Sequence, residues 1–61
     1  MVKKMFKLKI DTGNEAFSPD ATYEVARILK VASEKLEEGF SDGTLYDSNG
    51  NKVGEFSLTT R

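Results

Sequence analysis

Residues 44–60 read TLYDSNGNKVGEFSLTT, and this stretch decides the fold. Its Asn49-Gly50 pair predicts a β-hairpin, because Asn and Gly tolerate the positive φ angles of tight turns between antiparallel strands. With these two residues as the loop, the apolar residues of both strands gather on one side of the hairpin. The predicted cross-strand pairs are Leu45–Gly54, Tyr46–Val53 and Asp47–Lys52. The predicted inner face holds Leu45, Gly54, Phe56 and Leu58, and the outer face holds Tyr46, Val53, Glu55, Ser57 and Thr59.

The segment before the hairpin predicts one amphipathic helix between Pro19 and Glu38, where apolar residues recur at i, i+3, i+4 and i+7. Ser18 is the expected N-cap, and Pro19 fits the first helical position. Gly39 is expected to end the helix in the left-handed conformation, with Phe40 folding back as in a Schellman motif. The predicted apolar stripe consists of Val25, Ile28, Leu29, Ala32 and Leu36.

The first ten residues predict a further strand over 2–10, because apolar and basic residues alternate there. The order is therefore strand, helix, strand, strand. A right-handed crossover, with the last strand inserted between the other two, gives an antiparallel sheet in the order 1-3-2. We predict a single α+β domain over residues 1–61, a β-α-β-β arrangement with one helix on one face of the sheet. Val2, Phe6, Leu8 and Ile10 are expected on the covered face, and Lys3, Met5, Lys7 and Lys9 on the open face.

Composition limits the chemistry that the chain can perform. The 61 residues include no Cys and no His, which excludes disulfides, Cys/His zinc sites and Cys or His catalysis. We therefore expect no enzyme activity, no catalytic residue, no metal and no cofactor. Lysines interrupt any signal-peptide core near the N-terminus, and no apolar run reaches the roughly 20 residues of a membrane span. The expected location is the cytoplasm.

Two short motifs resemble functional sites but are better explained as turns. Asp11-Thr12-Gly13 matches the signature of aspartic proteases, which need two such carboxylates and a substrate cleft. Asp47-x-Asn49-x-Asn51 resembles the start of a calcium loop, but Lys52 and Leu58 stand where that loop requires Gly and Glu. Asp, Asn and Gly are the usual residues of strand-ending turns.

The open face of the predicted sheet is the candidate binding surface. Protein partners are favoured because exposed apolar groups gathered on an uncovered face often mark an interface. The lysines there would steer the encounter, and Tyr46 would serve as an anchor. Self-association through the same face is an alternative, and so is a partner bound by the acidic end of the helix. The predicted partner-binding residues are Met5, Lys7, Lys9, Tyr46, Val53 and Glu55.

A weak nucleic-acid binder is the second hypothesis, based on the lysines of the first strand and the C-terminal Arg61. The net charge of −1 disfavours it, since nucleic-acid binders usually carry a basic excess. Lysines on an edge strand also have a simpler role, because they prevent aggregation between sheet edges. The basic residues of this hypothesis are Lys3, Lys7, Lys9 and Arg61.

The sequence also resembles a group of short hypothetical proteins of bacteriophages and prophages. The resemblance spans nearly the whole chain, and it rests on Gly13-Asn14-x-Ala16-Phe17, Glu24-x-Ala26-Arg27-Ile28-Leu29, Leu36-Glu37-x-Gly39 and Leu45-x-Asp47-x-Asn49-Gly50-Asn51-x-Val53-Gly54. It implies a phage setting and no particular activity. By analogy with anti-CRISPR proteins, we expect a small binding protein that blocks a host defence complex in the bacterial cytoplasm, without a role at the membrane.

Overall fold

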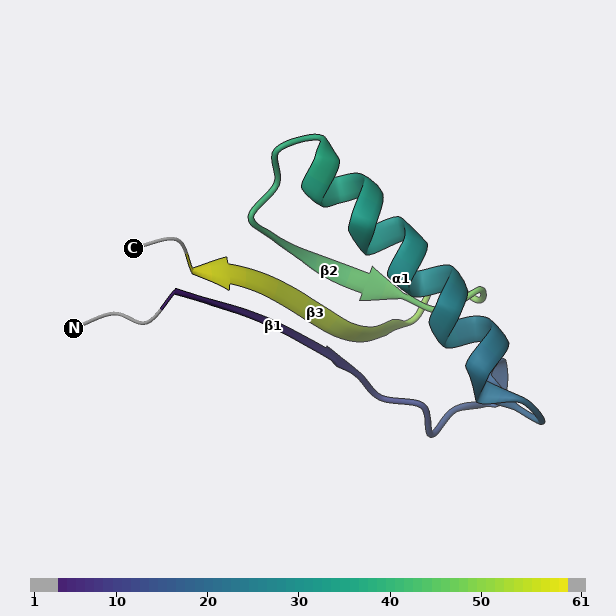
Figure 1. The fold of residues 1–61 in the computed structure, drawn as a ribbon. Helices are drawn as coiled ribbons and strands as arrows, with labels where there is room; N and C mark the ends of the chain where they lie inside the picture. The colour runs from purple at the N-terminus through teal and green to yellow at the C-terminus, as the bar shows by residue number, and fades with distance from the viewer. Residues whose placement is uncertain (1–3, 60–61) are drawn as a thin grey trace.

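The structure is a computed structural model that describes residues 4–59. It confirms the predicted architecture, with one helix on a three-stranded antiparallel sheet in the order β1-β3-β2 (Figure 1). Val2, Lys3 and Arg61 lie outside the described residues. The elements are β1 (Met5–Ile10), the 3-10 turn η1 (Glu15–Phe17), α1 (Ala21–Glu37), β2 (Asp42–Tyr46) and β3 (Lys52–Thr59).

The start of α1 differs from the prediction. Asp20 is the N-cap, and its side chain accepts a hydrogen bond of 3.0 Å from the Thr22 amide. Ser18 instead closes η1, since its backbone amide donates to the Glu15 carbonyl at 3.0 Å. The prediction of Ser18 as N-cap and Pro19 as first helical residue is therefore wrong, because the backbone of Ser18 is already used by a separate turn.

The end of α1 confirms the predicted Schellman motif. Gly39 has a φ of 101°, which costs a glycine little because it lacks a Cβ. The Gly39 amide donates to Leu36 at 3.0 Å, and the Phe40 amide donates to Lys35 at 3.1 Å. The Lys35 ammonium lies 5.1 Å from the centre of the Phe40 ring, so Phe40 folds back on the last turn.

The hairpin has a three-residue loop, where two residues were predicted. The Asp47 amide donates to the Asn51 carbonyl at 2.9 Å, and the Gly50 amide donates to the Asp47 carbonyl at 3.0 Å. Gly50 has a φ of 86°, but Asn49 does not have a positive φ, as a two-residue type I′ turn would require. Asp47 therefore faces Asn51, one residue away from its predicted partner Lys52.

Val53 corrects this one-residue shift. Tyr46 pairs with Lys52 and Leu45 pairs with Gly54, so Val53 is the extra residue of a β-bulge. From the Leu45–Gly54 pair toward the ends of the strands that lie away from the loop, the register is the predicted one. The predicted Tyr46–Val53 pair is wrong, and so is the outward position of Val53, whose side chain is buried at 7% exposure.

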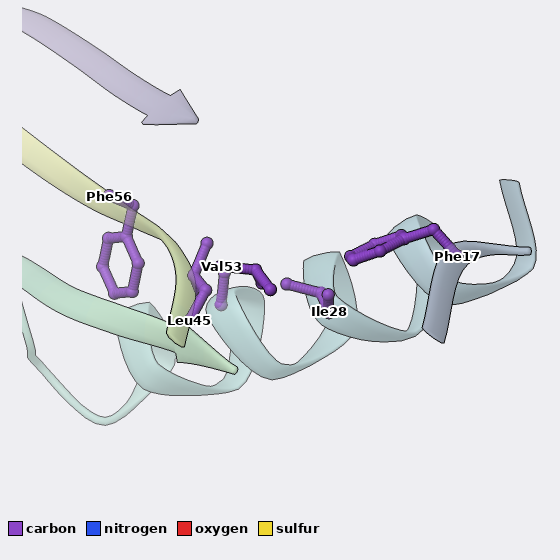
Figure 2. Packing of buried hydrophobic residues seen from close by; sticks show 6 residues of the cluster. Phe17, Ile28, Leu45, Val53 and Phe56 are labelled. Atoms are coloured by element: carbon purple, nitrogen blue, oxygen red, sulfur yellow. The ribbon is translucent and has the colours of Figure 1, made fainter. Parts of the chain in front are cut away.

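The buried core lies between α1 and the β2–β3 hairpin (Figure 2). Among the described residues, none of its six members comes from β1, which lies on the far side of β3 from β2 (Figure 1). Phe6 of β1 therefore remains 45% exposed, although it points to the inner face. Leu29, which was predicted in the apolar stripe, is also 45% exposed, because the sheet does not reach that flank of the helix. The core residues are Phe17, Ile28, Ala32, Leu45, Val53 and Phe56.

Gly54 allows the backbones of β1 and β3 to meet at the bulge. A Cβ built on Gly54 would overlap the carbonyl oxygen of Lys9, which is backbone and cannot swing aside. Gly43 has a different role, because a Cβ there would lie 2.7 Å from the ring of Phe56. That ring covers Gly43 from the opposite strand.

We therefore predict that Gly54→Ala lowers the free energy of unfolding by about 3 kcal/mol, at the upper end of overpacking costs, because backbone must move. Urea unfolding followed by circular dichroism measures the loss. Ser57→Ala, at an exposed position of the same strand, is the control and should change stability by less than about 0.5 kcal/mol. Equal stability of both variants would contradict the close approach of β1 and β3.

Candidate interaction surface

The face of the sheet opposite α1 forms the open face. Its centre is Glu55 on β3, with Lys9 opposite it on β1 and Thr44 opposite it on β2. All three side chains are exposed. The pairs that line the open face are Met5–Thr59, Lys7–Ser57, Lys9–Glu55, Asp42–Ser57, Thr44–Glu55 and Tyr46–Lys52.

Charge is distributed unevenly over the open face. The Lys52 ammonium lies 3.8 Å from a Glu55 carboxylate oxygen, and Lys9 is the cross-strand neighbour of the same carboxylate. Such exposed pairs contribute little to stability. Lys7 faces Ser57 and has no carboxylate directly opposite it. The β1 side of the open face is therefore basic, whereas the only charged residue within β2 is Asp42.

The predicted apolar group on this face is not contiguous. Val53 is buried, and Met5 and Tyr46 lie on different edge strands. Met5 pairs with Thr59 and Tyr46 pairs with Lys52, so opposite ends of β3 separate them by roughly 20 Å. The structure thus brings together Lys7, Lys9 and Glu55. Met5 and Tyr46 stand apart from that centre.

A second apolar area lies at the start of β1. Met5, Phe6 and Leu58 are 40%, 45% and 38% exposed and line a shallow hollow of about 340 Å³ together with Lys4 and Thr59. Phe6 faces Leu58 across the strands, and the ring centres of Phe6 and Phe56 are 6.2 Å apart. We call this the Phe6–Leu58 hollow.

The other end of the sheet carries a buried polar cluster that the sequence did not predict. Glu24 of α1 is 4% exposed and accepts two hydrogen bonds from the Arg27 guanidinium, at 3.0 and 2.9 Å. The Ser48 amide in the hairpin loop donates to Glu24 at 2.7 Å, and Arg27 also donates to the Tyr46 carbonyl at 3.3 Å. Glu24 therefore ties the helix to the hairpin loop.

Asp47 anchors the loop in the same region, with 4% exposure. One carboxylate oxygen accepts the amides of Asn49 and Asn51 at 2.9 Å each. The other accepts the side-chain amides of Asn14 at 2.8 Å and of Asn51 at 3.3 Å. Asp47 thus joins the hairpin loop to the segment that precedes the helix.

Hydrogen bonding holds both carboxylates in the ionised form. The pKa of Glu24 is lowered, chiefly by the bidentate bonds from Arg27, and the pKa of Arg27 is raised by the same contact. For Asp47, burial raises the pKa, but bonds from Asn51, Asn14 and Asn49 together outweigh burial and lower it. Every buried side-chain nitrogen or oxygen in residues 4–59 has a partner. These contacts stabilise the fold. We call the residues that make them, Asn14, Glu24, Arg27, Asp47 and Asn51 with the Ser48 amide, the clasp.

The two motifs singled out in the sequence form turns, as predicted. The Asp11 carboxylate accepts the Gly13 amide at 2.9 Å, and Asp47 and Asn51 close the hairpin loop. In the described part of the chain no group of three or more Asp or Glu residues is arranged to hold a metal ion. Within residues 4–59 no helix has the length and apolar character needed to cross a membrane.

No family model, curated protein or solved structure matches the chain.

The clasp predicts a specific pH dependence. A lowered pKa stabilises the folded state at pH values above the ordinary pKa, which is 4.5 for Glu24 and 3.8 for Asp47. That contribution is lost as the pH falls through the lowered values. The melting temperature should therefore be steady from pH 8 to about 5 and fall below that.

Glu24→Gln tests the assignment to the clasp. At pH 7 it should lower the melting temperature by about 5 °C or more, because Arg27 and the Ser48 amide lose a charged acceptor. Its melting temperature should also fall less steeply in acid than that of the wild type. Glu37→Gln, at an exposed position of the same helix, is the control and should follow the wild-type curve. Identical curves for all three proteins would contradict the clasp.

Proposed function

We propose that this chain is a small non-enzymatic interaction module that binds a protein partner through its open face. Lys7, Lys9 and Glu55 form the centre of the binding surface, with Tyr46 at the hairpin end and Met5 at the other. The observation that carries the proposal is the exposed, mixed-charge sheet face that α1 leaves uncovered. The buried carboxylates of Glu24 and Asp47 support the non-enzymatic part of the proposal, because hydrogen bonds within the clasp already occupy them.

The mechanism is steric occupation of a partner surface. Lysines on the β1 side steer the chain toward an acidic region of the partner surface. Glu55 and Asp42 repel a partner surface that is acidic throughout. Tyr46, at 54% exposure, supplies a rigid aromatic contact. The phage resemblance supports the setting, in which the partner is a host protein complex of the bacterial cytoplasm and the outcome is inhibition of a defence, by analogy with anti-CRISPR proteins.

Matched substitutions on two faces of the molecule test this proposal. Tyr46→Ala and Lys7→Glu alter the open face, whereas Tyr23→Ala and Lys30→Glu make the same changes on exposed positions of α1. Each variant is immobilised and exposed to bacterial lysate, and the captured protein is identified by mass spectrometry. We expect capture by the wild type and by both helix variants, and at least a tenfold loss for the open-face variants, in line with a 1.4 kcal/mol anchor.

Two binding results would contradict the proposal. One is capture that all four substitutions leave unchanged. The other is tight binding of a labelled single-stranded oligonucleotide that weakens steeply from 50 to 200 mM salt and is abolished by Lys7→Glu, which would favour the nucleic-acid alternative. Light scattering at two protein concentrations completes the test, since a dimer that buries the open face would make self-association its function.

A further inference from the structure

We infer that the free edge of β1 accepts one extended segment of the partner as a fourth strand, and that this segment alternates acidic and apolar residues. The inference rests on the proposed function, because Lys7 and Lys9 belong to both surfaces. It adds a partner chemistry and a backbone contact. Within residues 4–59 no strand runs along the outer side of β1, which is an edge of the sheet (Figure 1).

Hydrogen-bond alternation identifies the free backbone groups. The Asp11 amide donates to the Val53 carbonyl at 2.7 Å, so the odd-numbered positions of this antiparallel pair face β3. The amides and carbonyls of Phe6, Leu8 and Ile10 therefore point away from β3, toward the outer edge. An added antiparallel strand would form its hydrogen-bonded pairs with these three residues.

The side chains along the edge define what the added strand must carry. Phe6, Leu8 and Ile10 point to the inner face, where α1 covers β2 but leaves Phe6 and the Phe6–Leu58 hollow exposed. Residues opposite them must be apolar. Lys7 and Lys9 point to the open face at the intervening, non-hydrogen-bonded positions, where facing side chains are closest. Residues opposite these lysines must be acidic.

The same lysines disfavour a second copy of β1 as the occupant. A two-fold antiparallel pair that keeps both open faces together matches odd positions with odd positions. In the two registers with the longest overlap of β1, Lys7 faces Lys7 or Lys9 of the other copy, so lysine repulsion is not relieved. An acidic strand converts this repulsion into attraction.

The opposite edge of the sheet is less suitable. The outward carbonyl of Tyr46 on β2 already accepts a hydrogen bond from Arg27, and α1 packs against β2. Asp42 is the only charged residue within β2, so that edge has no basic group to select an acidic segment. Charge and access thus favour β1.

The experiment uses a fluorescein-labelled seven-residue peptide that alternates glutamate and valine, added to the full chain and followed by fluorescence anisotropy. We expect saturable binding and slower hydrogen exchange at the amides of Phe6, Leu8 and Ile10. N-methylation of the valines removes the donors that face β1 and should abolish binding. N-methylation of the glutamates, whose amides face solvent, should change affinity by less than about threefold.

Variants and a reference peptide test the side-chain contacts. Lys7→Glu with Lys9→Glu should weaken binding by about tenfold or more, and a lysine–valine peptide should not bind. Lys30→Glu with Lys35→Glu is the matched control on α1 and should bind normally. No saturable binding would overturn the inference, and so would equal binding of both N-methylated peptides or of the lysine–valine peptide.

Tyr46→Ala separates this inference from the proposed function. Tyr46 lies on β2, so peptide binding should survive its removal while capture of the partner is lost. Capture that depends on Tyr46 without any peptide binding would refute the inference alone. Peptide binding without Tyr46-dependent capture would refute the open-face proposal alone.

Discussion

The single extra residue in β3 is the constraint on which the rest of the sheet depends. The three-residue loop shifts the hairpin by one position, and that register, if continued, would turn Glu55 toward the helix and Phe56 toward solvent. The bulge at Val53 absorbs the shift and adds an apolar side chain to the core. It also requires close contact between backbones at Gly54. This one inserted residue thus keeps Phe56 on the buried face and Glu55 on the open face.

The clasp ties the helix to one end of that sheet. Glu24 and Arg27 tie the first half of α1 to the hairpin loop and to the end of β2. A helix is about 10 Å wide and strands are about 4.8 Å apart, so a helix held over β2 also covers β3. Leu8 and Ile10 of β1 are only partly buried against this core, and the start of β1 is left exposed. Phe6, at the start of β1, therefore remains exposed.

The sequence was sufficient for features that depend on local patterns. The alternation in β1 and the Schellman residues Gly39 and Phe40 were predictable, because each follows from spacing or from a glycine. The Leu45–Gly54 pair was predicted from a two-residue loop, and it is correct because the bulge at Val53 cancels the extra loop residue. The loop length was not predictable, since Asn-Gly suits both two- and three-residue loops. Because the loop length was not predicted, the bulge could not be predicted either, and the burial of Val53 was missed.

The clasp left one trace in the sequence. Glu24 lies four residues before Ile28 and so falls on the apolar stripe of the helix, where a carboxylate needs a buried partner. Its partners Arg27 and Ser48 could be found only once the hairpin loop was placed in space. The same holds for Asp47 and Asn14, which are distant in sequence. Polar contacts between loops depend on tertiary structure and have no periodicity of their own.

The size of the β1 edge limits what it can do alone. Six residues with three outward amides and one shallow hollow offer far less than the roughly 800 Å² per partner of a stable interface. Binding at the edge alone would therefore be weak and rapidly reversible. A partner that binds firmly must also cover the open face, where Lys7 and Lys9 adjoin the edge and Glu55 lies beside them. In the proposed complex, edge and face would act as one surface, with the strand setting the register and the open face supplying the area.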